Sequence, residues 1–524
     1  MAVDFSRYLP PGVYTNPTPG PQLAVNSTLP TAVALFGCGV GFRTYVESIL
    51  INPNTNDTTP AVNQNLSKQG IKTSTIAVSD PNSGQPYVLG ADYTVLCTQG
   101  TTGTSDALYT IQIVIDGHID PGDYIQVSYN YTDPTYFTPY TFYDYDDVRA
   151  AYGEPFVTSG PNAGQIQSEL TLGAKFAFLN GAYQVVCVAV NPANPAAPTV
   201  GEYGVALDQL KDDALVAVIV PCTGQQPVFQ QVAQHVQYES NNRYERRAIL
   251  GLDGTINAVP SSQRIIDAEE IVGYVSDDEM AKRLMLVSPA TFTYYSPELN
   301  NTVTLGGQFM AASLAGITVS QSFAMPLTRK VITGWTGVGE VEPDGQKNLE
   351  SQSGLCVVEF TRRMLMQVRH GVSVDNIDMI HREWSITGQQ DALVYRLRDY
   401  LENANLIGQP IYSFTLINVK SSAEAALQSL IRDGLLVGYM GLKARQLLTN
   451  PDVIEVSFSW LPAFPLNYIV VTFNISLTSG NITTNAGSTA SEVNSSNQLT
   501  TTIGTPTSSS VNDFGGPSNT LMST

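Results

Sequence analysis

Apolar runs alternate with helix-like stretches through the middle of this chain. Continuous apolar runs predict buried strands, and the stretches between them, with apolar residues three and four positions apart, predict helices. The predicted strands lie at 183–190, 215–220 and 247–252, and the predicted helices at 170–179, 205–211 and 228–239. Because alternating strands and helices favour a sheet covered by helices, we expect a central α/β domain over residues 140–345. Its first part, residues 30–60, supplies a further strand at 31–37.

A second pattern, of short strands, fills residues 61–139. An Asn/Thr/Pro-rich linker leads into it, and runs such as 109–115 and 124–131 alternate apolar and polar residues between Asp-Pro and Pro-Gly turns. Such alternation with frequent turn signals is typical of antiparallel strands. We therefore expect an all-β module inserted into the α/β domain.

Residues 346–467 predict an α+β C-terminal domain, after a Gly- and Glu-rich stretch at 334–354 that lacks periodicity. The residue pattern predicts strands at 356–360, 378–386, 412–417 and 455–461, and helices at 390–407 and 421–432. Ser421 and Glu424 stand at capping-box spacing, which favours a helix start there.

Both ends of the chain are extended in pattern. Residues 1–29 contain Pro10, Pro11 and Pro17, which disfavour a helix, and residues 468–478 form a β-branched and aromatic run after every other element. Because a terminal strand can pair with another molecule's sheet, we predict that both ends link copies of the chain. The candidate inter-subunit strand residues are Val13, Tyr14, Ile469, Val471, Phe473 and Ile475.

The last 46 residues, 479–524, are a low-complexity Ser/Thr/Asn tail with no basic residue. A segment with so few apolar residues does not bury enough surface to fold alone. The tail is either disordered or an extended strap that orders only against neighbouring copies.

Charge narrows the classes of partner. The chain carries 46 acidic and 26 basic residues, a net charge of −20. Phosphate backbones and anionic membranes attract basic patches, so we expect neither nucleic acid nor a membrane as partner. Charged residues are only 14% of the chain, below the quarter typical of soluble domains. A surface so rich in uncharged polar residues suits a protein whose exterior becomes interface, although a secreted adhesin shows the same bias.

Cysteines and the N-terminus point to a reducing compartment. The five cysteines, Cys38, Cys97, Cys187, Cys222 and Cys356, are widely spaced and odd in number, which favours buried thiols over a disulfide framework or a zinc site. The start of the chain lacks the basic and apolar regions of a signal peptide, and no apolar run is long enough to span a bilayer. We expect assembly in a cytoplasm.

Candidate chemistry is weak throughout. Gly37-Cys-Gly-Val-Gly-Phe-Arg43 follows a strand, but the last glycine of a dinucleotide fingerprint is replaced by Phe42, so a glycine-rich turn is favoured. His381 and Glu383 are expected on one face of a strand, without the cysteine pair of a zinc deaminase. Asp144, Asp146 and Asp147 lack the glycine and glutamate of a calcium loop and instead favour a helix start. We expect no catalytic residue, metal or cofactor.

Two acidic groups leave alternatives open. Asp277-Asp-Glu279 and Asp267 with Glu269-Glu270 are expected as solvated helix starts, or as partners of basic residues on another copy. The basic candidates for such pairing are Arg243, Arg246, Arg247, Arg362 and Arg363.

Several short motifs, in their order along the chain, resemble the sheath proteins of contractile phage tails and related injection machines. The motifs are Pro11-Gly-Val-Tyr14, Thr31–Gly37, Tyr140–Val148 followed by Tyr152-Gly153, Leu172–Gly181, Tyr294-Tyr-Ser-Pro297, Gly306-Gly307, Ala315-Gly316 and Ala324-Met-Pro326. No one of them is specific, but their order over most of the chain is. The arginines at 362, 363, 369 and 382 are spaced differently from those of the family's C-terminal domain.

The resemblance implies a structural subunit rather than an enzyme. Copies are expected to stack as hexameric rings around a tail tube, and to contract so that the tube crosses the host envelope and the genome is ejected. The resemblance also implies a tube-proximal C-terminal domain, an outward-facing β module, and a place in the virion tail with tail tube protein, baseplate and tail terminator as partners. Lys420, Arg432, Lys443 and Arg445 are the tube-facing candidates, or else a solvated basic edge. The alternatives are a sheath of a bacteriocin or secretion machine, and a surface adhesin.

Overall fold

The computed structural model describes residues 29–39, 41–52, 63–100, 107–191 and 198–473. The described residues from 29 to 467 belong to one compact unit, and residues 468–473 belong to a second. Within the described residues no helix is both long and apolar enough to cross a membrane.

An eight-stranded sheet forms the centre of the first unit. Its order is β16-β15-β11-β10-β9-β1-β8-β7, and the six inner strands are parallel while β7 and β16 pair antiparallel at the edges. The strands are β1 (Ala32–Cys38), β7 (Tyr140–Phe142), β8 (Val185–Val190), β9 (Val216–Pro221), β10 (Arg247–Gly251), β11 (Leu284–Ser288), β15 (Leu355–Phe360) and β16 (Met366–Val368). Continuous apolar runs form the inner strands because both of their faces are covered.

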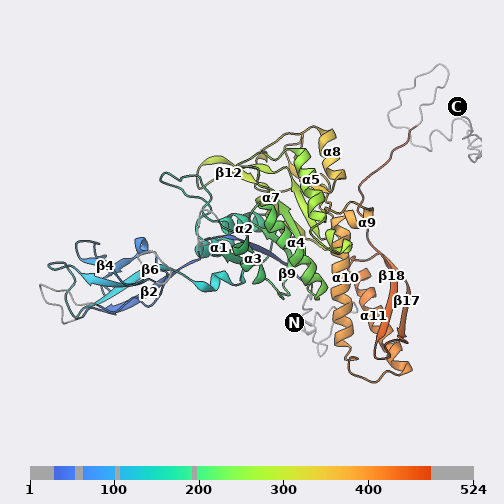
Figure 1. The fold of residues 1–524 in the computed structure, drawn as a ribbon, viewed down its shortest axis with the longest axis horizontal. Helices are drawn as coiled ribbons and strands as arrows, with labels where there is room; N and C mark the ends of the chain where they lie inside the picture. The colour runs from blue at the N-terminus through green and yellow to red at the C-terminus, as the bar shows by residue number, and fades with distance from the viewer. Residues whose placement is uncertain (1–28, 40, 53–62, 101–106, 192–197, 474–524) are drawn as a thin grey trace, which may run out of the picture. The chain divides into compact units, whose positions relative to one another are not determined.

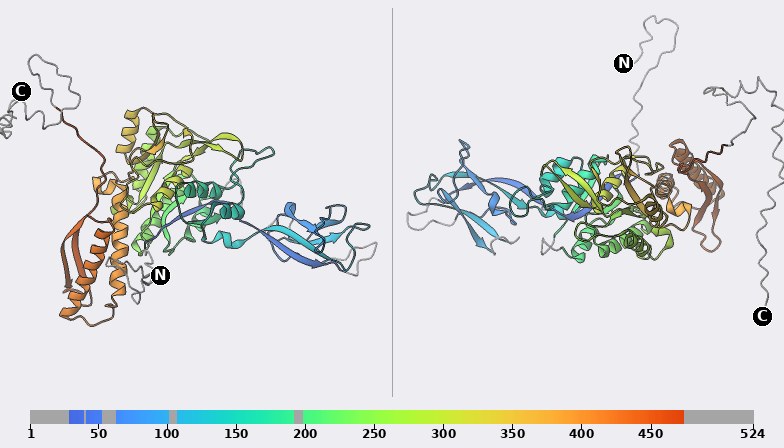
Figure 2. Two further views of the ribbon diagram at one scale, coloured as in Figure 1. Left: turned by 180° about the vertical axis from the view of Figure 1, so that it is seen from behind. Right: turned by 90° about the horizontal axis from the view of Figure 1, so that it is seen from above.

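Helices cover the sheet on both faces, as Figures 1 and 2 show. Alternate residues of β1 separate the two layers: Val33 and Leu35 join one apolar core, and Ala34 and Phe36 join the other. The first core contains residues of α1 (Tyr145–Tyr152), α2 (Glu169–Leu179) and α7 (Gly307–Ser320). The second contains residues of α3 (Val200–Asp208), α4 (Gln226–Asn241) and α5 (Ser261–Val272). The α/β expectation from the apolar runs is confirmed.

Short elements complete this body. Side chains cap the starts of α1, α2 and α3: Asp144 caps α1, Ser168 caps α2, and Thr199 forms a capping box with Glu202 at α3. Asp146 and Asp147 lie in the first turn of α1, as expected. The remaining elements are α6 (Asp278–Ala281), α8 (Asp344–Gln352) and a small antiparallel sheet of β12 (Thr291–Ser296), β13 (Asn301–Gly306) and β14 (Gly337–Val338).

The insertion between β1 and β7 is a β module with its own core. Its strands are β2 (Phe42–Leu50), β3 (Ala77–Ser79), β4 (Tyr93–Gln99), β5 (Leu108–Ile113) and β6 (Tyr124–Thr132), with the 3-10 turns η1 (Thr73–Thr75) inside it and η2 (Pro134–Phe137) after it. They form the sheets β2-β6-β3 and β4-β5. The module's sheet thus begins at Phe42, earlier than residue 61, because β2 pairs along the whole of β6. The N–H of Asp133 donates to the carbonyl of Gly41 at 2.8 Å, which closes the base of the insertion.

The C-terminal part consists of helices and one hairpin: α9 (Met379–Arg382), α10 (Trp384–Asn403), α11 (Ser413–Arg432), β17 (Gly438–Gln446) and β18 (Ile454–Leu461). The sequence interpretation placed residues 346–467 in one domain, whereas β15 and β16 join the central sheet. They do so because β15 pairs parallel with β11 through Leu286 and Leu355.

Two predicted strands of this part are wrong. Residues 412–417 begin α11, since Thr415, Val419 and Ala423 start a buried stripe that repeats every four residues along one helix face. Ser421 and Glu424 are therefore inside the helix and cap nothing. Residues 378–386 form α9 and the start of α10, with Asp378 accepting the N–H groups of Ile380 and His381 as an N-cap.

The expectations for histidine and acidic groups are also corrected. His381 lies on α9 and contacts Glu279 at 3.2 Å, whereas Glu383 is buried against His370 at 2.9 Å, so the two do not share a face. Asp277 does cap α6, as expected. Asp267, however, is buried in the second half of α5, because helix periodicity turns it toward the sheet, and it starts no helix.

Candidate assembly surface

The β17–β18 hairpin is the most exposed sheet of the body. Its strands pair antiparallel from Gly438 with Leu461 to Gln446 with Ile454, with one irregularity between Met440 and Lys443. Within the described residues neither strand pairs with a third. Each outer edge therefore presents unpaired backbone N–H and C=O groups, the template on which another strand is added.

One face of the hairpin packs on α11. Tyr439, Leu442, Phe458 and Trp460 lie against the small core formed by α10 and α11, and the Tyr439 hydroxyl contacts Glu424 at 3.3 Å. Figures 1 and 2 show α10, α11 and the hairpin side by side. The buried apolar side chains of this core are Ala392, Leu393, Leu427, Leu430, Leu435 and Leu436. So small a core fixes the hairpin by one face and leaves the other free.

Large apolar side chains are exposed around this part of the chain. Met440 is 72% exposed on β17, and Phe414 and Ile417 are 55% and 67% exposed on α11. The rings of Tyr412 and Phe414 stack at 5.2 Å on the surface. Apolar residues gathered in this way mark interaction surfaces, and here they adjoin the open sheet edges.

Buried polar side chains hold the segment that leaves β18. The Gln389 side chain donates to the carbonyl of Ala463 at 3.0 Å and accepts its N–H at 2.7 Å. The Asn467 amide donates to Glu383 at 2.9 Å. Residues 462–467 are thereby tied to the start of α10, so the chain leaves the first unit from a fixed point. Leu29 packs against the same α10–α11 core, so the N-terminal arm departs from this part as well.

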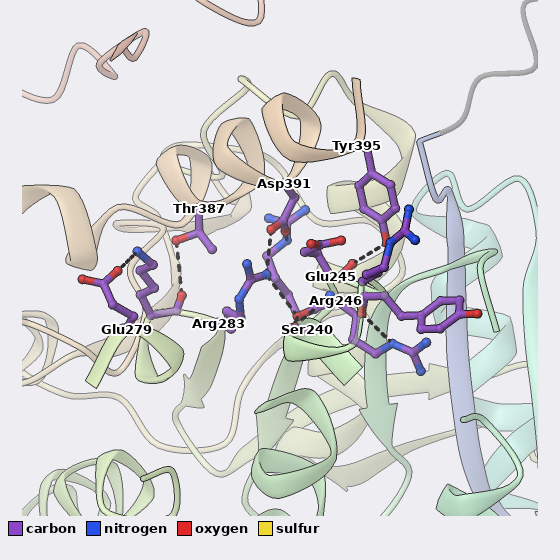
Figure 3. Close-up of polar contacts among 12 residues, drawn as sticks. Ser240, Glu245, Arg246, Glu279, Arg283, Thr387, Asp391 and Tyr395 are labelled. Carbon is purple, nitrogen blue, oxygen red and sulfur yellow. Dashed lines mark hydrogen bonds and ion pairs between the residues drawn. The ribbon is translucent and has the colours of Figure 1, made fainter. Parts of the chain in front are cut away.

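An ionic cluster anchors α10 to the central sheet, as Figure 3 shows. Asp391 accepts from Arg283 at 2.6 Å and lies 3.5 Å from Arg247. Farther along α10, the Tyr395 hydroxyl donates to the carbonyl of Glu245 at 3.1 Å. Thr387 contacts the carbonyl of Lys282 at 3.4 Å. The cluster lies where β10 and β11 begin, and it positions the helices and hairpin on that edge of the sheet.

Arginines of this cluster are buried with their counterions. Arg246 lies 3.1 Å from Glu239 with both side chains fully buried, and it also contacts His235. Burial lowers the pKa of Arg247 to about 10 and, together with the charge of Arg246, that of His235 to about 3. At neutral pH Arg247 is therefore charged and His235 is neutral. Arg246 and Arg247 are thus unavailable for pairing with another copy.

The sequence signal for this cluster was present but missed. Basic pairs stand at the starts of two successive buried strands: Arg246 and Arg247 at the start of β10, and Lys282 and Arg283 directly before β11. Parallel neighbouring strands begin at the same sheet edge, so both pairs were bound to meet there. Asp391 gave no signal, because a single carboxylate in an amphipathic helix is ordinarily solvated.

The structure describes only half of the inter-subunit strand candidates. Ile469, Val471 and Phe473 are each more than three-quarters exposed and belong to no strand of the described chain. Val13, Tyr14 and Ile475 lie outside the described residues, as does the tail at 479–524. The six therefore stay candidates.

The tube-facing candidates do not share one face. Lys443 and Arg445 alternate along β17, on the face opposite Leu442 and α11, and Arg445 pairs with Glu455. Lys420 and Arg432 are exposed on α11 itself. The hairpin separates the two pairs.

Elsewhere the body has a buried carboxyl, that of Glu169, at the end of β1. Oε2 of Glu169 accepts the N–H of Cys38 at 2.8 Å and the hydroxyl of Tyr203 at 3.2 Å. Burial raises the pKa of Glu169 to about 7. The Glu169 carboxyl thus already accepts the backbone N–H of Cys38 at the glycine-rich turn after β1, where a dinucleotide phosphate would otherwise bind.

The thiols and acidic groups that the structure describes form no further site. Cys187, Cys222 and Cys356 are buried, and burial raises the pKa of each. Among the described residues no group of three or more His, Cys, Asp or Glu side chains is arranged to hold a metal ion. The exposed hairpin remains the candidate surface.

Comparison with known proteins gives one close relative. The chain is 43% identical to the tail sheath protein of Mycobacterium phage Bxz1, over 94% of this chain and the whole of that protein. No family model matches the sequence.

Two solved assemblies share the fold. A chain of the six-fold symmetrised baseplate of the anti-feeding prophage and a chain of that particle's helical sheath in the contracted state each align with a TM-score of 0.50 and 12% identity. Each alignment covers 66% of this chain and 90% of the other.

Proposed function

This chain belongs to the contractile tail sheath protein family, and we propose that its copies polymerise around a tail tube by exchanging strands through both chain ends. The observation that carries the proposal is the β17–β18 hairpin, whose two outer edges pair with no other strand in the described chain and which lies beside the points where both ends leave the body. A strand from a neighbouring copy would complete each edge. The hairpin then serves as the acceptor, and residues 1–29 and 468–478 serve as the donors.

Side-chain burial must drive this exchange. Hydrogen bonds of an eight-residue arm contribute about 1 kcal/mol each, whereas ordering its backbone costs about 1 to 2 kcal/mol per residue. Backbone pairing alone is therefore insufficient to hold the arm in place. Burying large side chains such as Val13, Tyr14, Ile469, Val471, Phe473 and Ile475 adds about 1.5 to 3 kcal/mol each. Free copies consequently persist until a template supplies a neighbour.

The assembly, contraction and partners expected of the family are also proposed for this chain. We infer hexameric rings that stack helically on the tube and contract to drive it through the host envelope for genome ejection, in a virion tail assembled in host cytoplasm. The C-terminal part is proposed to face the tube, and because the hairpin separates the candidates, either Lys443 and Arg445 on the hairpin or Lys420 and Arg432 on α11 are the cationic contacts in an otherwise acidic chain. Baseplate and tail terminator are the further partners, and no catalysis, nucleic acid or membrane is involved.

A bacteriocin or secretion sheath is the second candidate. The shared fold of the anti-feeding prophage sheath favours it, but the relative with 43% identity comes from a phage. Neither comparison supports an adhesin.

Deleting residues 1–20 tests the proposal. The expected product is a folded monomer that forms no tubes, because it retains every described element but lacks the donor arm. Negative-stain electron microscopy and thermal unfolding measure the two properties. A control variant replaces the same residues by Gly/Ser of equal length, and it should fail equally because it lacks Val13 and Tyr14. Normal tubes from either variant would refute the linkage.

A further inference from the structure

Two exposed arginines occupy an ordered hairpin tip on the central sheet. Thr361–Leu365 joins β15 to β16, and backbone bonds close it: the N–H of Thr361 donates to Leu365, and that of Met364 donates to Thr361, both at 2.9 Å. Arg362 and Arg363 project from this turn and are exposed. The turn therefore presents two positive charges at a defined place.

These arginines are unusual in this chain. Among the described residues, every other arginine except Arg329 forms an ion pair within the chain, Arg243 included. Arg246 and Arg247 are buried. Of the five arginines that the sequence offered for pairing with another copy, the structure leaves Arg362 and Arg363.

The structure also reduces the number of acidic residues that are candidates for pairing with another copy. Asp267 is buried and accepts from Gln263, and Glu279 pairs with Lys282 and His381. Glu269 and Glu270, near the end of α5, are exposed and form no ion pair in the described chain. They are adjacent, whereas Asp277, which is also exposed without an ion pair in the described chain, caps α6 by accepting the N–H of Glu279.

Apolar side chains accompany both pairs. Ile266, 46% exposed, precedes Glu269 and Glu270 by three and four residues and so shares their face of α5. Met364 and Leu365, 74% and 41% exposed, stand beside the two arginines. The two surfaces match in charge and in apolar content.

The two surfaces lie at opposite ends of the parallel strands of the central sheet. The arginine tip follows β15 and so lies where the parallel strands end. Helix α5 connects β10 to β11 and runs antiparallel to them, so that its end lies where the strands begin. Its 12 residues span about 18 Å. The two surfaces of one copy therefore do not meet.

We propose that Arg362 and Arg363 of one copy bind Glu269 and Glu270 of a neighbouring copy in the assembled sheath. The contact joins different surfaces of identical subunits, and such head-to-tail contacts generate rings or open helices. It rests on the proposed polymer and adds to it a specific ionic contact between central domains, independent of the chain ends.

Charge exchange in the full-length chain tests this contact. R362E/R363E and E269R/E270R should each lower the fraction of protein that sediments as polymer at low salt about tenfold, because like charges then face each other. The variant that carries all four substitutions should recover to within about twofold of wild type. R149E/K211E reverses two exposed basic residues elsewhere and should sediment as wild type does.

The possible results distinguish failure of the ionic contact from failure of the proposed function. Wild-type assembly by R362E/R363E, or no recovery in the four-residue variant, would overturn the contact while leaving the strand-exchange polymer intact. Absence of polymer from the wild-type chain would instead contradict the proposed function and the contact with it. Circular dichroism of the unassembled variants verifies that each is folded.

Discussion

At the scale of single residues, buried charges in this protein are tied to chain geometry. Asp391 holds α10 on the sheet because Arg283 and Arg247 approach it from the starts of two strands. Glu169 fills the turn after β1. Each of these two carboxyl groups holds two elements of the fold together.

Asp391→Ala is predicted to destabilise the unassembled protein by about 3 to 5 kcal/mol, because two buried guanidinium groups lose their counterion. Urea unfolding measures the change. Asp399→Ala on the same helix is the control, since Asp399 accepts from exposed Asn403 and forms no ion pair among the described residues, and it should change the unfolding free energy by less than about 1 kcal/mol. Equal effects of the two substitutions would show that the cluster does not anchor α10.

Glu169 makes stability depend on pH. Its pKa rises from 4.5 to about 7 on folding, mainly through burial. The folded state therefore holds a proton that the unfolded state releases, and stability falls as pH rises from about 4.5 to 7, by about 3 kcal/mol in all. Glu169→Gln should remove this loss, so that the variant exceeds wild type in stability at pH 8 and matches it near pH 4.5.

Urea unfolding at these two pH values checks the prediction. Glu269→Gln, an exposed carboxyl on α5, is the control and should show no such difference. A stability gap of the same size at both pH values would mean that Glu169 titrates normally.

At the scale of elements, the predictions succeeded where burial on both faces produces a continuous apolar run. β8, β9 and β10 were found in this way. Residues 412–417 failed because their aromatic and β-branched residues have strand propensity, while the helix depends on a stripe continuing to Leu427 and Leu430 and on packing against α10. Only one strand of the hairpin, β18, was predicted from the sequence. β17 was missed because it contains charged and glycine residues and depends on pairing with β18.

The open edge of β17 gives a test of strand addition. The N–H of Leu447 donates to Val453 across the hairpin. Because inward and outward N–H groups alternate along a strand, the N–H of Ala444, three residues earlier, points away from β18. Ala444→Pro removes that outward donor and keeps the hairpin bonds, because proline is tolerated on edge strands. We expect a folded monomer with at least tenfold less polymer by sedimentation. Ala444→Ser retains the N–H and should assemble normally; loss of assembly in both variants would not support edge pairing.

At the scale of the whole molecule, the order of motifs predicted the family, while the contacts between copies depend on surfaces that no local pattern defines. Arg362 and Glu269 are ordinary charged residues in sequence. Only the fold shows that their neighbours are paired or buried and that they lie at opposite ends of the parallel strands of the central sheet.

The β module is predicted to be dispensable for assembly. Its core is its own, and Gly41 and Asp133 are held together at its base. Replacing residues 42–132 by a short Gly/Ser link should leave a folded chain that forms tubes with a thinner wall in electron micrographs. An insoluble product, or a soluble one that forms no tubes, would assign the module a structural role.

The central claim is that both chain ends complete a sheet in another copy. A cryo-electron microscopy map of wild-type tubes tests it most directly. The account predicts that β17 and β18 each pair with an added strand, one from residues 1–29 and one from 468–478, and that each strand traces back to a different copy. A hairpin that remains two-stranded, or one completed by the ends of its own chain, would contradict it.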